Sequence, residues 1–250
     1  MKKLPIILKS VLALSLAVAG LAQAVPVTFS GSDGLGRAAT VSFDLVGTDL
    51  LINLSNTSSS DVLVPVDVLT GVFFNIAGNP ALSRTSATSD GSTLLGTTIV
   101  NGAGTDVGSE WAYLNGLSQY GANSGISSSG LGVFGPGDRF DTVGNLSGPA
   151  SPDGLQYGIT SAGDDSSTGN AGVTGNELTK NSVSFVLGGL PGGFSLTDIS
   201  KVTFQYGTAL TEPSVPGGGG GGNEIPEPAS LVLLGLGLAG LSTTKRSKRN

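Results

Sequence analysis

The side chains that could do chemistry in this chain are mostly aromatic and acidic residues of its glycine-rich middle. Trp111, Tyr113 and Tyr120 lie close together in a stretch rich in Gly, Ser, Asn and Asp. Exposed aromatic rings stack on sugar rings while polar neighbours bond the hydroxyls, so one interpretation is a carbohydrate-binding surface. The other is that the three rings anchor the core, because burial of large aromatic side chains is strongly stabilising.

Carboxylates form a second group of candidates. Asp138 and Asp141 lie close together, and Asp164 and Asp165 are adjacent in another segment. Carboxylate and loop carbonyl oxygens are the ligands of Ca²⁺, so the first pair is a candidate calcium site. No EF-hand or repeated calcium motif is present, and aspartate is also common in solvated turns. Glu110 with a distant aspartate is a candidate pair for a carboxylate-based glycosidase, which needs two carboxyl groups at a defined separation.

Two amino acids that carry much of enzyme chemistry are missing. The 250 residues include no histidine and no cysteine. The first absence removes the usual general base and the commonest metal ligand, and the second removes thiol chemistry and disulfides. Ser-His, Cys-His and zinc-site mechanisms are therefore excluded, and no cofactor is predicted apart from the candidate Ca²⁺.

The charge of the chain is unevenly distributed. Seven of its 12 bases and one of its 18 acids lie before residue 25 or after residue 225, so residues 25–225 carry five bases, 17 acids and a net charge of -12. Affinity for nucleic acid depends on Lys and Arg that neutralise phosphates, so this acidic body is not a nucleic-acid ligand.

The elements that must position these residues are short β-strands. In residues 39–45, Val41, Phe43 and Leu45 alternate with polar side chains, and a second alternating run follows in residues 50–55. Two alternating runs joined by a short polar turn predict an antiparallel hairpin with one buried face.

Further strands are expected at residues 68–76, 183–187 and 202–206, with Pro65 marking an edge or a break before the first of them. No segment of the mature body shows a convincing helical period, and helices are expected only in the signal peptide and in the short carboxyl-terminal membrane segment. The sequence therefore predicts an all-β fold, a single β-sandwich of jelly-roll type over residues 25–212. Residues 101–176 are too poor in apolar side chains for a detailed prediction.

The amino terminus has the pattern of a secretory signal peptide over residues 1–24. Three lysines precede an apolar stretch, and Ala22 and Ala24 fit the small-x-small cleavage pattern. We expect export through the Sec machinery and a mature chain that begins at Val25.

The carboxyl terminus begins with a Pro- and Gly-rich segment, residues 213–225, which includes six consecutive glycines. Such a segment is typical of a flexible linker. An apolar run follows at residues 229–241. Its 13 residues would make a helix of about 20 Å, shorter than the roughly 30 Å hydrocarbon core of a bilayer. The bases that follow are expected to stay cytoplasmic, with the body outside. They are Lys245, Arg246, Lys248 and Arg249.

Residues 226–250 as a whole resemble the PEP-CTERM sorting signal of bacterial exosortase substrates. Pro226, Glu227 and Pro228 match the motif, and the apolar run and the basic tail follow in the expected order. A Gly-Gly signal for rhomboid-type proteases is the nearest alternative. The resemblance implies export, transient anchoring in the inner membrane and cleavage by exosortase. It also implies a place at the cell surface or outer envelope, or in the extracellular matrix, of a Gram-negative-type bacterium that makes exopolysaccharide and biofilm.

Three functions remain open at this point. The first is a surface or matrix protein without catalytic activity, associated with exopolysaccharide. The second is a carbohydrate-binding module on the cell surface, and the third is a secreted glycoside hydrolase that uses carboxylates alone.

Overall fold

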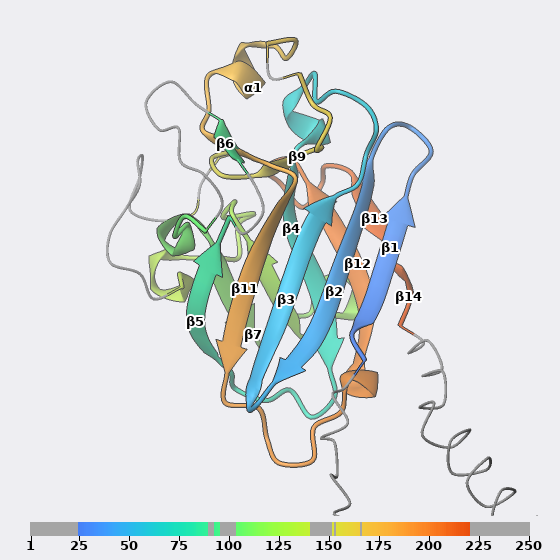
Figure 1. Ribbon diagram of the computed structural model, residues 1–250, viewed down its shortest axis with the longest axis vertical. Coiled ribbons are helices and arrows are strands. Elements are labelled where there is room, and N and C mark those ends of the chain that lie inside the picture. The colour runs from blue at the N-terminus through green and yellow to red at the C-terminus, as the bar shows by residue number, and fades with distance from the viewer. Residues whose placement is uncertain are drawn as a thin grey trace, which may run out of the picture.

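The computed structural model describes residues 25–89, 93–95, 104–140, 152, 154–165 and 167–220. Within them the chain forms two β-sheets (Figure 1). The first sheet contains β1 (Val27–Ser32), β2 (Ala38–Val46), β3 (Asp49–Asn56), β5 (Ser83–Thr88), β11 (Ser182–Gly188) and β14 (Gly218–Gly219). The second contains β4 (Leu69–Ile76), β6 (Thr93–Leu95), β7 (Ala112–Asn115), β8 (Ser124–Ser127), β9 (Ile159–Thr160), β10 (Leu178–Lys180), β12 (Ile199–Tyr206) and β13 (Ser214–Pro216).

Helical structure in the described residues is limited to short turns. These are α1 (Ala171–Thr174) and the 3-10 turns η1 (Pro65–Asp67), η2 (Gly108–Glu110), η3 (Gln119–Gly121), η4 (Pro136–Asp138) and η5 (Leu196–Asp198). No helix of the described chain is long and apolar enough to cross a bilayer.

The all-β prediction is confirmed, and the strand order refines it. The first sheet runs β14-β1-β2-β3-β11-β5 and is antiparallel throughout. The second runs β13-β12-β4-β9-β10-β6, and β8 joins β7 to β4. Because β1, β2 and β3 are consecutive neighbours in one sheet, this part of the fold is a meander. A jelly roll alternates between its two sheets instead, so the jelly-roll prediction is corrected.

The predicted hairpin is formed by β2 and β3. Their register pairs Val46 with Asp49 at the turn and Phe43 with Ile52 further along. The period-two pattern places Val41, Phe43 and Ile52 on the inner face, where all three are fully buried. A one-residue slip would turn these side chains to solvent, so burial of this face holds the register.

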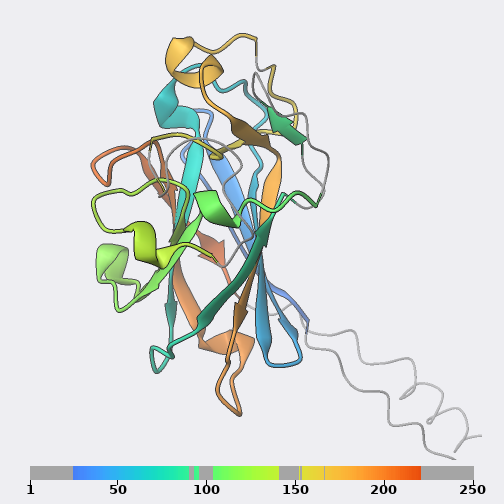
Figure 2. The same cartoon turned by 90° about the vertical axis from the view of Figure 1, so that its left-hand side faces the viewer.

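Strand β4 is buried on both faces: seven of its eight residues are buried, among them Val72, Phe73 and Phe74. Pro65 lies in η1, which interrupts the extended backbone just before β4, as one of the two interpretations of this proline predicted. The other interpretation, that β4 is an edge strand, is wrong, because β4 pairs with β12 on one side and with β8 and β9 on the other. Segments on either side of β8 lie on the outer face of the second sheet (Figure 2), where Leu131 and Phe134 pack against Phe73.

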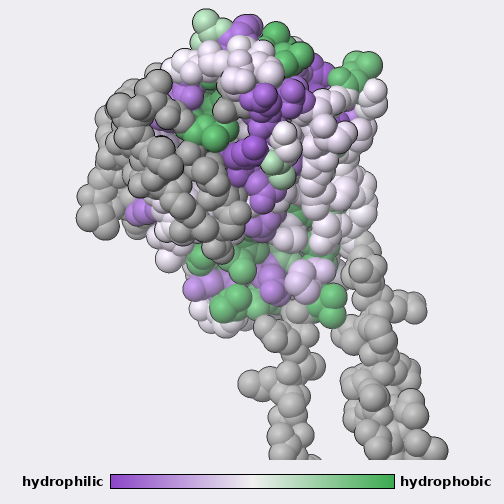
Figure 3. All heavy atoms as spheres, turned by 45° about the horizontal axis from the view of Figure 1, so that its top comes forward, coloured by the Kyte–Doolittle hydropathy of each residue, from purple (hydrophilic) through white to green (hydrophobic). Residues whose placement is uncertain are grey.

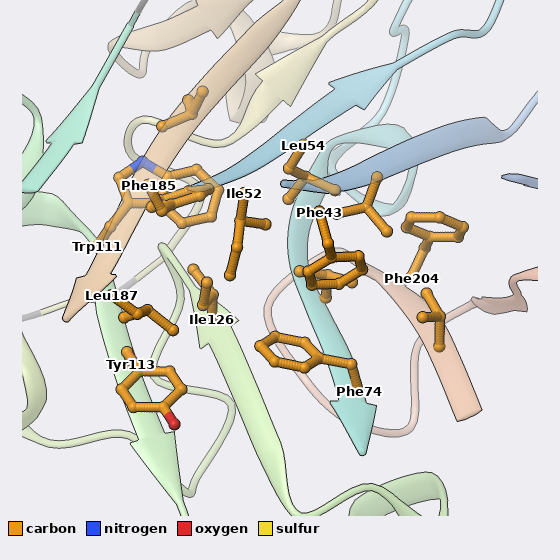
Figure 4. Close-up of a cluster of buried hydrophobic side chains, with 14 of the residues drawn as sticks. Phe43, Ile52, Leu54, Phe74, Trp111, Tyr113, Ile126, Phe185, Leu187 and Phe204 are labelled. Atoms are coloured by element: carbon orange, nitrogen blue, oxygen red, sulfur yellow. The ribbon is translucent and has the colours of Figure 1, made fainter. Parts of the chain in front are cut away.

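The core fills the space between the sheets. Phe43 of the first sheet contacts Phe74 of the second edge to face, with ring centroids 5.1 Å apart. Aromatic pairs in this geometry add roughly 0.5–1.5 kcal/mol beyond the burial of their area. Figure 4 shows these rings beside aliphatic side chains from both sheets.

Candidate functional site

The residues of the predicted sorting and cleavage signals lie outside the described part of the chain. This applies to Ala22 and Ala24, to the motif at residues 226–228 and to the basic tail at residues 245–249. The structure does describe how the chain approaches the motif, up to Gly220.

The segment expected to be a linker from residue 213 onward begins inside the fold. In β13, Val215 pairs with Phe204 of β12 and is 2% exposed. In β14, Gly219 pairs with Phe29 of β1. The boundary expected after Glu212 is therefore corrected: the body extends to residue 220, because backbone pairing and burial of one valine hold these residues in place.

The chain passes from the second sheet to the first at Gly217. The Gly217 amide donates to the Val202 carbonyl of β12 at 2.9 Å, and the Gly220 amide donates to the Thr28 carbonyl of β1 at 3.1 Å. Residues 213–220 thus connect the two sheets along one side of the sandwich, where β1 and β13 lie next to each other (Figure 1).

Glycine is required in this crossing for steric reasons. A Cβ at Gly219 would lie 2.6 Å from the Thr28 carbonyl oxygen, and one at Gly217 would lie 2.9 Å from the Val202 side chain. Gly219 and Gly220 also have φ values of 116° and 86°, a region that other residues rarely adopt. Four of the six consecutive glycines, residues 217–220, therefore belong to the folded body.

The predicted aromatic surface is not assembled. Trp111 is fully buried, and its ring lies 4.9 Å from that of Phe185 of β11 in an edge contact. Tyr113, in β7, is 1% exposed. Both side chains point into the core (Figure 4), so the prediction that they stack on a carbohydrate is corrected in favour of core anchoring.

Tyr120 is separated from these two rings and is 39% exposed. Its ring packs edgewise on Phe73, and its hydroxyl donates to Gln205 at 2.6 Å. These contacts hold Tyr120 on the outer face of the second sheet, away from the inner face that Trp111 occupies.

The candidate aspartates that the structure describes accept hydrogen bonds that stabilise turns and loops. Asp138 accepts a hydrogen bond from the Gly135 amide at 2.8 Å and caps η4, while Asp141 lies outside the described residues. Asp164 accepts from the Val62 amide at 2.7 Å, and Asp165 accepts from Ser167. No group of three or more acidic residues in the described chain could hold a metal ion.

Glu110 does not face solvent. It lies at the end of η2, is 2% exposed and accepts a hydrogen bond from the Ser109 hydroxyl at 3.3 Å. A glycosidase carboxylate has to reach its substrate, and in this position Glu110 does not.

Sequence inspection missed a charged cluster at one end of the sandwich. Arg37 pairs with Asp33 at 2.7 Å and with Asp67 at 2.9 Å, which ties the turn between β1 and β2 to η1. Partial burial raises the pKa of Asp33. Hydrogen bonds from the Leu35 amide and from Arg37 outweigh that effect and lower the pKa below its usual value of 3.8. Asp67 is 30 residues from Arg37 in sequence, so no local pattern pointed to this cluster.

Two small pockets lie at opposite ends of β2. One, of about 170 Å³, is lined by Leu35, Asp61 and Leu63 among others, and the second, of about 230 Å³, by Leu45, Thr48, Leu190 and Phe194 among others. Both are smaller than the roughly 300–1,000 Å³ of most small-molecule sites. Figure 3 shows the end that carries α1, where hydrophobic side chains are separated by polar ones.

The described residues form a two-sheet β body, and the predicted carboxyl-terminal signal follows it in the sequence. A family model of the PEP-CTERM protein-sorting motif matches residues 224–247. No curated protein and no solved structure matches the chain. The chain thus carries a PEP-CTERM sorting motif and is an exosortase-dependent sorting substrate. The motif implies export to the cell envelope or surface, with exosortase as the processing partner.

Proposed function

We propose that this protein is a surface or extracellular-matrix component without catalytic activity, which exosortase cuts near Pro226–Pro228 after Sec-dependent export. The sorting motif at residues 224–247, joined to a compact β body, is the observation that carries the proposal. The signal peptide at residues 1–24 and the transient inner-membrane anchor at residues 229–241 complete the export route.

The absence of catalysis is supported by residue types and their positions. The sequence has no histidine or cysteine, Glu110 is buried, and Asp138 is occupied as a turn cap. Purified residues 25–220 are expected to leave a broad panel of glycosides unchanged. Reproducible hydrolysis of any of them would show that the protein is an enzyme.

Association with exopolysaccharide and biofilm belongs to the same proposal and is supported by the resemblance of the sorting segment to that of other exosortase substrates. The mature protein is expected to sediment with exopolysaccharide extracted from the producing cells. Equal recovery in the supernatant with and without polysaccharide would contradict this part.

The decisive experiment removes the motif. Deletion of residues 226–250, or replacement of Pro226, Glu227 and Pro228 by alanine, is expected to abolish carboxyl-terminal cleavage and normal surface localisation. The control is Leu35→Ala, at an 81% exposed position in the turn between β1 and β2. Mass spectrometry of the exported product and cell fractionation give the readout. Unchanged processing of the deletion variant would refute the proposal.

A further inference from the structure

The position of Gly220, the last described residue, restricts how the body can meet its processing enzyme. Strand β14 is antiparallel to β1, with Ser30 opposite Gly218 and Phe29 opposite Gly219. At Gly220 the chain therefore runs toward the beginning of β1. Because β1 is antiparallel to β2, with Val27 opposite Phe43, both described termini point toward the end of the sandwich where β2 finishes at Val46.

This end is called the exit end here and consists of the turn at Gly47–Thr48 and the loop at residues 189–194. The two parts are joined, since the Leu190 amide donates to the Thr48 carbonyl at 3.1 Å. Between them lies the pocket lined by Leu45 and Phe194. Val46 is 55% exposed at its margin, so the exit end presents apolar surface.

The tether between body and motif is short. Only five residues, 221–225, separate Gly220 from Pro226. At no more than about 3.6 Å per residue, this tether allows the motif to lie at most about 20 Å from Gly220. Had the chain left the fold at Glu212, as a linker from residue 213 would imply, the same limit would be about 50 Å.

More than half of this maximum length is needed for the chain to pass alongside the body from Gly220 to the exit end. Gly220 is hydrogen-bonded to Thr28, which pairs with Ser42 of β2. Val46 is four residues further along β2, about 13 Å at the rise of a β-strand. Pro226 can therefore extend less than about 10 Å past the exit end, which is narrower than one α-helix with its side chains.

We propose that the exit end of the sandwich is a contact surface for the membrane-embedded exosortase that cuts the sorting segment. This inference rests on the proposed function and adds the face of the body that the enzyme meets. When an enzyme binds residues 226–228, the gap between the enzyme and the body is smaller than the diameter of one helix. The enzyme therefore contacts Val46 and the loop at residues 189–194. The opposite end, with Leu35, stays away from the enzyme.

The absence of cysteine allows a direct test on the full chain. Val46→Cys introduces a single thiol at the exit end, and Leu35→Cys is the matched control at the other end of β2, where Leu35 is 81% exposed. Each precursor is labelled with a short thiol-reactive photocrosslinker, mixed with membranes containing exosortase, and illuminated early in the reaction. Adducts are quantified with an antibody against exosortase.

We expect exosortase adducts from Val46→Cys and few from Leu35→Cys. Inserting about a dozen Gly and Ser residues after Asn223 should lower the Val46→Cys yield about sixfold, because effective concentration falls steeply with tether length. Equal yields from both ends in the chain of natural length would overturn the inference.

The same experiment separates the two proposals. If the unlabelled full chain is not cut by exosortase-containing membranes, the proposed function fails. If it is cut while both thiols crosslink equally, only the contact surface is refuted.

Discussion

At the residue scale, the described side chains that the sequence offers as candidate ligand-binding groups stabilise the body. Trp111 fills the core beside Phe185, and the described carboxylates bond backbone amides in turns. Among the described residues, Arg37 forms ion pairs with Asp33 and Asp67.

The buried tryptophan should matter for stability. We expect Trp111→Ala to lower the free energy of unfolding by about 3–5 kcal/mol, because truncation leaves a cavity against Phe185. Urea denaturation of purified residues 25–220 measures the change. Leu35→Ala, at an 81% exposed position, is the control and should change it by less than about 0.5 kcal/mol. A loss below about 1 kcal/mol for Trp111→Ala would contradict burial.

Asp33 should make stability depend on pH. Its pKa is lowered in the folded state, so the stabilisation from its charged form is present above the usual value of 3.8 and is lost as the pH falls through the lower folded pKa. Asp33→Asn is expected to lack this part of the acid destabilisation. Urea midpoints of both proteins between pH 7 and acid pH give the comparison; curves that stay parallel down to the acid limit would show that Asp33 does not contribute.

At the element scale, the first part of the polyglycine segment has a role that its composition does not reveal. Residues 217–220 connect the sheets, whereas residues 221 and 222 lie outside the described residues. A strand of two residues is a weak element, so its attachment depends on glycine at each crowded position.

A side chain in β14 should detach it. We expect Gly219→Val to disrupt the pairing with β1, because its Cβ would meet the Thr28 carbonyl and its φ of 116° is unfavourable for valine. Hydrogen exchange at the Gly220 amide should accelerate. Gly192→Ala, in an exposed loop with no atom within 4 Å of the new Cβ, is the control. Slow exchange retained in Gly219→Val would mean that β14 tolerates a side chain.

At the scale of the whole molecule, the two sheets are completed by the last described residues. Val215 covers the core beside Phe204, and the crossing at Gly217 joins the sheets along their open side. The body therefore needs residues 213–220 to be complete, and the sorting segment begins almost directly after it.

Truncation tests this completeness. Fragments from Val25 to Glu212, Pro216 and Gly220 are expected to become more stable in that order. The step that adds Val215 should contribute about 1.5–3 kcal/mol, the value of burying one aliphatic side chain. Denaturant midpoints and slopes report the series. If the fragment ending at Glu212 were as stable as the longest one, β13 and β14 would not be part of the body.

Sequence alone determined those features that depend on local pattern. The alternation in residues 39–55 was enough to predict a hairpin and its buried face. In a strand with a period of two and one apolar face, the apolar face is the one that is buried. The order of motif, apolar run and basic tail likewise identified the sorting signal, which is a linear pattern.

Tertiary structure decided what depends on partners far along the chain. Trp111 could equally have faced solvent or the core, and its contact with Phe185, 74 residues away, settled its role. The glycines after Pro216 have the composition of a flexible linker, yet the Thr28 and Val202 carbonyls hold two of them in place. Local sequence specifies which conformations a segment tolerates. Only the surrounding fold supplies the hydrogen bonds and apolar contacts that select one of them.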